Sequence, residues 1–247
     1  MPVEAPGIRP APLESARFGV KTARADGMTA AALGAALDYC QAGGVQLLIA
    51  RCPVEDLMAT HAFGAAGFEL MDTLVYYERD LVGSPVTGGS PAQFALLQAD
   101  DIDPVEAIAR ECFRNYGGHY HADSRLDRDA CTEVYASWAR SCCEQKDPAG
   151  FVLVVREAGR TVGFSAFRRN DESEGELLLG AVLPAARGAG LYRRLTTEGM
   201  ARLQSSGATR FLTSTQLGNW SAQASWTAAG LRPFRAFHTF HRWFDWA

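Results

Sequence analysis

The sequence lacks the features that mark several large classes of protein. Its 247 residues contain no run of Lys and Arg, and 24 basic residues stand against 28 acidic ones, for a formal net charge of -4. Without a basic patch, nucleic acid is not an expected partner. No apolar stretch approaches the roughly 18 residues of a membrane-spanning helix, so a membrane is not an expected partner either.

The cysteines also lack a functional pattern. No C-x-x-C pair occurs, although zinc ribbons and thioredoxin-like proteins require one. No cysteine has neighbouring residues that would activate its thiol. We therefore expect no metal and interpret all six as small, buried hydrophobic residues: Cys40, Cys52, Cys112, Cys131, Cys142 and Cys143.

The first fourteen residues, MPVEAPGIRPAPLE, lack the basic and apolar segments of a signal peptide. They contain two acidic residues and four prolines instead. The whole sequence is 47% hydrophobic and 21% charged, which is ordinary for a soluble protein with a sizeable core. We therefore expect a cytoplasmic protein.

A stretch rich in Gly, Ser and Pro divides the chain. GSPVTGGSP, at residues 83–91, follows a strand-like run and precedes a new periodic segment. We predict a small N-terminal α/β domain at 1–82, a linker at 83–92 and a larger domain at 93–247.

Hydrophobic periodicity predicts alternating strands and helices in both domains. In the N-terminal domain these are a strand at 45–51, a helix at 55–66 and a strand at 69–80. The larger domain has the predicted order ααβββαβαβ, and its polar segment 118–127 is predicted as a loop between the first two helices. Its later elements are predicted at 129–143, 151–157, 161–169, 176–183, 190–205, 209–215, 220–229 and 233–243.

An arginine followed by alternating glycines lies between a predicted strand and a predicted helix. Residues 183–192 read LPAARGAGLY, with Arg187, Gly188 and Gly190 at its centre. Glycine allows close backbone approach to an anion, successive N–H groups can point at phosphate oxygens, and a helix N-terminus adds positive partial charge. The Gly-Lys-Ser/Thr of a P-loop and the third glycine of the dinucleotide fingerprint are both missing. The turn therefore predicts a diphosphate site of another kind.

The pattern V-x-P-x-x-R-G-x-G-L-Y at 182–192 resembles the acyl-CoA motif of the GNAT acetyltransferases. A second match follows at the spacing where that family commonly has Asn, Ala, Tyr and Gly-Phe: Asn219, Ala222, Trp226, Gly230 and Leu231. The resemblance covers residues 93–244. It implies an α/β (α+β) GNAT fold with a mixed central sheet whose middle strands splay apart, acetyl-CoA as cofactor, and transfer of an acetyl group to a primary amine.

The resemblance also implies roles for single residues. Backbone near Gly180 would polarise the thioester carbonyl, and Glu176 would help to deprotonate the amine through water, although a strand-end glutamate is often simply solvated. Trp226 stands where the family usually has its proton-donating tyrosine, so Tyr192, Ser225, water or the substrate would protonate the thiolate. The implied cofactor contacts are Ala181, Val182, Arg187, Gly188, Ala189, Gly190, Leu191, Tyr192, Arg193, Asn219 and Ala222.

In GNAT proteins the segment between the first two helices borders the acceptor pocket. This implies substrate contacts by His119, Tyr120, His121 and Arg125. Trp226 is interpreted either as a further substrate contact or as a packing residue. The two histidines of the last strand, His238 and His241, lie on opposite faces and are expected to be structural.

The N-terminal domain shows a narrower resemblance. ARFGVK at 16–21, LIARCP at 48–53 and GAAGFELMDTLVYYERDL at 64–81 resemble the opening domain of bacterial dTDP-fucosamine (dTDP-4-amino-4,6-dideoxygalactose) acetyltransferases. That family acetylates a nucleotide-linked amino sugar. Residues 64–68 also resemble 226–231, so we interpret this half as a degenerate, non-catalytic, partial GNAT-like domain.

Several functions stay open at this point. The first is an N-acetyltransferase acting on a small amine such as a nucleotide-linked amino sugar. The same enzyme class could act on a protein N-terminus, an antibiotic or a polyamine. A catalytically weak acyl-CoA-binding module acting as a sensor or regulator is the other alternative, and the aromatic last strand leaves a homodimer open.

Overall fold

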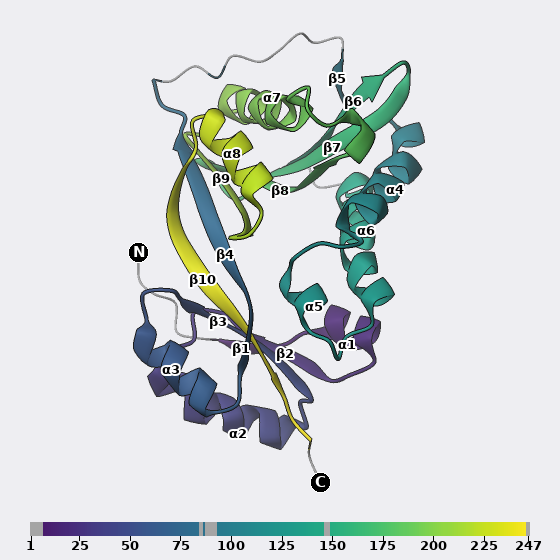
Figure 1. Ribbon diagram of the computed structural model, residues 1–247. Coiled ribbons are helices and arrows are strands. Elements are labelled where there is room, and N and C mark those ends of the chain that lie inside the picture. The colour runs from purple at the N-terminus through teal and green to yellow at the C-terminus, as the bar shows by residue number, and fades with distance from the viewer. Residues whose placement is uncertain (1–6, 84–85, 87–92, 146–148, 246–247) are drawn as a thin grey trace. The chain divides into compact units, whose positions relative to one another are not determined.

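Figure 1 shows the computed structural model, which describes residues 7–83, 86, 93–145 and 149–245. Contacts divide the chain into two compact units. Unit 1 comprises Met1–Val75, Gly117–Ala130 and Arg235–Ala247, and unit 2 comprises Tyr76–Tyr116 and Cys131–Phe234. The predicted linker at 83–92 lies almost entirely outside the described residues. The two domains that composition predicts, 1–82 and 93–247, stay a prediction.

Unit 1 is an α/β unit with strand order β1-β2-β3-β10-β4. Strands β2 and β3 pair in parallel, and β10 pairs antiparallel with β3. The helices and strands found here are β1 (Ile8–Pro10), α1 (Pro12–Phe18), β2 (Thr22–Ala25), η1 (Ala30–Ala32), α2 (Leu33–Gly43), β3 (Leu47–Pro53), α3 (Leu57–Ala65), the first part of β4 (Glu69–Asp80), α5 (His119–Ala122) and most of β10 (Arg232–Trp243).

The short helix α5 corrects the prediction of a loop at 118–127. Its first residue, His119, donates its backbone N–H to the Asp72 carboxylate (2.9 Å), and the Ala122 N–H bonds to the Gly118 carbonyl (3.1 Å). A side chain from β4 thus satisfies an N–H group that would otherwise lack a partner at the helix start. Because this cap comes from a distant part of the sequence, the local pattern could not reveal the helix.

Unit 2 has strand order β10-β4-β9-β8-β7-β6-β5. The predicted order ααβββαβαβ is found, with two short elements added before the first helix. The elements are the rest of β4, β5 (Phe94–Leu96), η2 (Ala99–Asp101), α4 (Ile102–Phe113), α6 (Arg128–Glu144), β6 (Gly150–Glu157), β7 (Arg160–Arg169), β8 (Glu174–Val182), η3 (Pro184–Ala186), α7 (Leu191–Ser205), β9 (Arg210–Gln216), α8 (Trp220–Ala228) and the start of β10.

Helices cover both faces of the sheet in unit 2 (Figure 1). Phe164 and Ala166 of β7 belong to a core shared with α4 and α6. On the other face Phe167 packs so tightly on α7 that a Cβ atom at Gly199 would lie 2.0 Å from its ring. A bulge between Ala166 and Phe167 shifts the register of β7 against β8. Small residues and alternating apolar side chains therefore fix α7 directly above the central strands.

A βαβ segment occurs twice. Strands β3 and β9 each have seven residues, α3 and α8 nine, and β4 and β10 twelve. Both helices have a side-chain N-cap, from Asp56 and Asn219, and both are followed by a glycine of positive φ, Gly67 (+77°) and Gly230 (+80°). This agreement supports the interpretation of the N-terminal half as a partial repeat.

Candidate active site

Strands β8 and β9 pair in parallel and then separate. Their register begins at Glu174 and Arg210 and ends at Leu177 and Thr213, although β8 continues to Val182 and β9 to Gln216. Backbone groups of residues 178–182 that face β9 are therefore left without a partner strand. The predicted splay of the middle strands is confirmed.

The first copy of the repeat shows no such opening. Every residue of β2, from Thr22 to Ala25, is paired with β3, from Leu47 to Ala50. The Met28 N–H continues this contact with a hydrogen bond to the Arg51 carbonyl (2.8 Å). An open strand pair is thus found in unit 2 but not at the equivalent strands of unit 1.

The turn after β8 presents backbone N–H groups. Gly188 (φ +97°) and Gly190 (φ +70°) adopt left-handed conformations, and Gly190 is the N-cap of α7. The first N–H of the helix with a carbonyl acceptor is that of Arg194, which bonds to Gly190 (3.1 Å). Within the described chain, the N–H groups of residues 188–193 have no acceptor. Successive free donors at a helix N-terminus form a site suited to a diphosphate.

The Arg187 side chain turns back toward the end of β8. Its Nε donates to the Val182 carbonyl (3.1 Å), and Cys112 Sγ lies 3.5 Å from the same oxygen. Burial raises the pKa of the Cys112 thiol, and the nearby guanidinium opposes this effect. Arg187 thus adds positive charge beside the turn while it holds the strand end in place.

Gly180 lies under two side chains. A Cβ atom there would be 2.5 Å from Ser165 Oγ and 3.1 Å from Cε2 of Tyr192. Ser165 Oγ is buried and has no hydrogen-bond partner among the described residues. The Tyr192 side chain is half-buried, and desolvation in these packed surroundings, reinforced by the neighbouring Tyr116 phenol, raises the pKa of Tyr192 well above the ordinary tyrosine value. Tyr192 is therefore protonated at neutral pH.

Trp226 lies in the interior of unit 2, with 2% of its surface exposed. Its ring packs on Tyr77 and Tyr192, with centroids 5.5 and 6.5 Å away. Its indole Nε1 has no acceptor of good geometry within the described residues, although it lies close enough to the Tyr192 hydroxyl to lower that group's pKa slightly. These contacts favour the packing interpretation of Trp226 over substrate contact.

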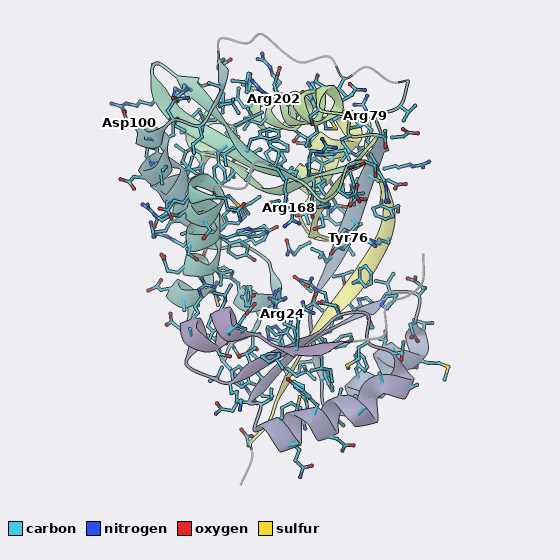
Figure 2. The ribbon with its side chains drawn as sticks, turned by 180° about the vertical axis from the view of Figure 1, so that it is seen from behind. Arg24, Tyr76, Arg79, Asp100, Arg168 and Arg202 are labelled. Carbon is cyan, nitrogen blue, oxygen red and sulfur yellow. The ribbon has the colours of Figure 1, made fainter. Side chains whose placement is uncertain are left out.

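Glu176 lies on β8 in the part that is still paired with β9, opposite Leu212. Its carboxylate forms an ion pair with Arg168 of β7 at 3.1 Å, and both side chains are partly exposed. Figure 2 shows Arg168 among the side chains of the sheet. The carboxylate that the sequence suggested as a base therefore has a guanidinium partner on the neighbouring strand.

A polar chain that the sequence did not indicate reaches the open part of β9. Asn219 caps α8 by accepting the Ala222 N–H (3.3 Å) and donates from Nδ2 to Oγ1 of Thr215 (2.9 Å). Oγ1 of Thr215 also lies 3.1 Å from the Tyr116 hydroxyl. Both polar atoms of Asn219 thus have partners within unit 2, and its contact with a cofactor stays a prediction. Tyr116 was visible in the sequence only as the residue before Gly117-Gly118.

The predicted acceptor-loop residues lie in unit 1. His119, Tyr120 and His121 are buried, whereas Arg125 is exposed and lies over the Trp243 ring at 5.5 Å. Tyr120 donates to Glu14 (2.9 Å) and accepts from Arg24, which is labelled in Figure 2. Substrate binding by these four residues stays a prediction.

Three expectations from composition concern metal sites, cysteines and membrane-spanning helices. No group of three or more His, Cys, Asp or Glu among the described residues could hold a metal ion. None of the six cysteines, all of which lie in the described part of the chain, forms a disulfide; Cys40, Cys52 and Cys131 are buried, and the other three are partly exposed. No described helix is both long and apolar enough to span a membrane.

An opened parallel strand pair, followed by a glycine turn that presents N–H groups at a helix start, defines a class of acyl-CoA-dependent transferases. Residues 103–230 match the family model described as the acetyltransferase (GNAT) family, which is more than half of the chain. The chain belongs to this family, which uses acetyl-CoA as its co-substrate.

Relatives and solved structures agree with this membership. The mycothiol acetyltransferase of Actinosynnema mirum is 31% identical over 129 residues, 52% of this chain and 41% of that protein, so the chain spans about two fifths of its length. A GCN5-related N-acetyltransferase from Sphaerobacter thermophilus has a TM-score of 0.64 at 14% identity, covering 90% of this chain and 73% of that one. One from Kribbella flavida has a TM-score of 0.61 at 17% identity, covering 90% and 80%. At these identities the structures show a shared fold alone.

Proposed function

We propose that the chain is an acetyl-CoA-dependent N-acetyltransferase whose acceptor is a primary amine. The observation that carries the proposal is the run of unpaired N–H groups at residues 188–193, directly after a strand that has parted from its neighbour. Acetyl-CoA supplies an activated acetyl group as a thioester. A diphosphate is the part of that molecule that such a run of donors fits best.

Different residues hold the different parts of acetyl-CoA in this proposal. Gly188, Ala189, Gly190, Leu191, Tyr192 and Arg193 hold the diphosphate through their amides, with Arg187 adding positive charge. Backbone at Ala181 and Val182 holds the pantetheine arm, and Asn219 and Ala222 flank it at the start of α8. Backbone at Gly180 donates to the carbonyl oxygen, where negative charge develops during attack.

Proton transfer needs further groups. The amine must lose a proton before it attacks, and Glu176 assists through water when it is released from Arg168. Tyr192 forms the wall over Gly180 and keeps its own proton at neutral pH, because burial raises its pKa. It therefore shapes the carbonyl site, and it is one candidate for protonation of the leaving sulfur.

For the acceptor we propose a small amine carried on a sugar, with a nucleotide-linked amino sugar as the first candidate. The support is the resemblance of residues 16–21, 48–53 and 64–81 to dTDP-fucosamine acetyltransferases. His119, Tyr120, His121 and Arg125 are the proposed substrate contacts, whereas Trp226 is proposed to pack beside the site. A cytoplasmic location and a homodimer complete the proposal, and sedimentation of the purified chain tests the latter.

Binding of coenzyme A, measured by calorimetry, tests the proposed cofactor site. Gly188→Ala adds a methyl group where no atom lies within 4 Å, so it acts through the φ of +97°. Gly207→Ala is the matched control, because Gly207 has φ +99° and equally open surroundings but lies after α7. Both variants lose similar stability, whereas only Gly188→Ala weakens binding, by about tenfold or more. Equal affinities in the two variants, or no heat with the parent chain, contradict the proposal.

Thiol release with a panel of acceptors tests the reaction itself. The panel contains amino sugars, nucleotide-linked amino sugars, peptides, polyamines, aminoglycosides and the mycothiol-type acceptor that the name of the curated relative indicates. Release with one acceptor class identifies the substrate. Tight binding of coenzyme A without thiol release in the presence of any acceptor favours a sensor or regulator. The absence of a hydroxyl at Trp226 supports this alternative.

A further inference from the structure

The proposed reaction requires a proton donor for the leaving thiolate, and residue 226 cannot supply it. An indole N–H donates a hydrogen bond but does not ionise usefully. Of the two adjacent hydroxyl residues, Ser225 is partly exposed and donates to the Ser221 carbonyl of its own helix (2.9 Å), and Thr227 is exposed. Tyr192 packs on the Trp226 ring, and desolvation together with the Tyr116 phenol raises the pKa of Tyr192, which makes it a weaker proton donor. A second phenol near the open strands is therefore the better candidate.

Tyr116 has this placement. It follows α4, and its N–H bonds to the Phe113 carbonyl (3.2 Å). Its ring is held edge-on by Phe113 and Tyr135, with centroids 5.0 and 5.2 Å away. The residue is partly exposed, and its hydroxyl lies 3.1 Å from Oγ1 of Thr215. Thr215 follows Thr213, the last residue of β9 that is paired with β8, so the hydroxyl of Tyr116 reaches the opened part of the sheet.

The donor and acceptor roles in the hydrogen bonds that connect Asn219, Thr215 and Tyr116 can be assigned. The Asn219 amide nitrogen is only a donor, so Oγ1 of Thr215 accepts from it (2.9 Å). Thr215 is 3% exposed, and a buried hydroxyl proton without an acceptor is unfavourable. The Tyr116 oxygen is the acceptor at hand, so the favoured order runs from Asn219 through Thr215 to Tyr116. In that order the proton of Tyr116 is directed to a further acceptor.

We propose that Tyr116 donates the proton to the departing thiolate, with Thr215 as its positioning residue. The inference rests on the proposed function. The bond between the amine nitrogen and the acetyl carbon forms, the carbon–sulfur bond breaks with its electron pair on sulfur, and the Tyr116 proton passes to sulfur. The amine's surplus proton leaves to water, and Tyr116 regains a proton from water at its exposed side.

The surroundings of Tyr192 agree with this assignment of Tyr116. The Tyr116 phenol is one of the groups that raise the pKa of Tyr192, so the two hydroxyls lie in one neighbourhood. Tyr192 in turn contacts the Trp226 ring, at the position that the family uses for its tyrosine. The hydroxyl that residue 226 lacks is thus supplied by the turn after α4, from a residue distant in sequence but present in the same unit.

Tyr116→Phe is the decisive variant, because it keeps the ring contacts and removes only the hydroxyl. We expect kcat to fall about 10²-fold or more, while the KM for acetyl-CoA and the calorimetric Kd for coenzyme A change less than about twofold. The alkaline limb of the parent pH–rate profile should also disappear. Thr215→Val, which keeps the shape of the side chain, should lower kcat by about tenfold and shift that limb.

Tyr192→Phe is the comparison, since Tyr192 is the competing donor. If Tyr116→Phe keeps full activity and Tyr192→Phe loses most of it, the donor role of Tyr116 is overturned, whereas the proposed function is not. A Tyr116→Phe chain that loses affinity for coenzyme A in step with kcat also overturns it, because that result indicates a binding role. If the parent chain neither binds coenzyme A nor releases thiol, the proposed function itself fails.

Discussion

Nδ1 of His241 lies 2.6 Å from Oδ2 of Asp123, and both side chains are buried in unit 1. On the other side of the ring, Nε2 of His241 lies 2.9 Å from Nδ1 of His119. An ionised carboxylate only accepts, so His241 carries its proton on Nδ1 and accepts the Nδ1 proton of His119 at Nε2. One carboxylate therefore orders the tautomers of two histidines, one from β10 and one from α5.

Replacing this carboxylate should strongly destabilise unit 1. Asp123 also accepts from Trp243 Nε1 (2.8 Å) and from the Arg125 N–H (3.0 Å). Asp123→Ala leaves the buried His241 N–H and these two donors without their acceptor, so we expect the free energy of unfolding to fall by about 3 kcal/mol in urea titrations. Asp245→Ala, at an exposed position two residues after Trp243, should change the free energy of unfolding by less than about 0.5 kcal/mol. Equal effects in the two variants would argue against an ordered network.

The same network predicts a loss of stability in mild acid. Burial lowers the pKa of His119 well below its ordinary value, helped by the positive charges of Arg51 and Arg24. In the unfolded chain the pKa returns to about 6.5, so below that pH the unfolded state binds more protons than the folded state. The free energy of unfolding should therefore decrease as the pH falls below about 6.5.

His119→Gln should remove part of this slope, because glutamine does not titrate. Some slope remains, since burial also lowers the pKa values of His121 and His238. Urea unfolding at about pH 7.5 and about pH 5.5 measures the difference. A variant whose stability depends on pH as steeply as that of the parent chain would show that His119 is not held neutral in the folded state.

Two glycines should respond in opposite ways to alanine. At Gly199 of α7 a Cβ atom would lie 2.0 Å from the Phe167 ring, whereas at Gly64 of α3 nothing lies within 4 Å. We expect Gly199→Ala to lower the free energy of unfolding by about 1 to 3 kcal/mol through overpacking. Gly64→Ala should raise it by up to about 1 kcal/mol, because alanine favours helix. Thermal unfolding of both variants checks the contrast, and a tolerated alanine at residue 199 would mean that α7 is less tightly packed.

Much of unit 2 could be predicted from sequence because its signals are local. The glycines at 188 and 190 are separated by one residue, and their conformations can be expected without any distant contact. The alternating apolar residues of β6 to β8 and the periodicity of α7 are local in the same sense. The family resemblance rested on these segments, and the matched residues 103–230 confirm it.

The site was only partly predictable because its geometry depends on distant partners. Nothing near Tyr116 in the sequence indicates Thr215, and nothing near His119 indicates Asp72 or His241. The sequence suggests that Glu176 is a free carboxylate at a strand end, whereas in the structure it forms an ion pair with Arg168 of the neighbouring strand β7. In each case the partner comes from another element, and a side chain's chemistry follows from that partner.

The sequence by itself determined the kinds of elements, the anion-holding turn and the family, because backbone conformation and hydrophobic period are set within a few residues. Only the tertiary structure decided where β8 leaves β9, that β10 completes the sheet of unit 1, and which hydroxyl reaches the open strands. Those features arise when segments far apart in the chain compete for the same hydrogen-bond partners and the same core. Such competition is resolved only when the whole chain packs.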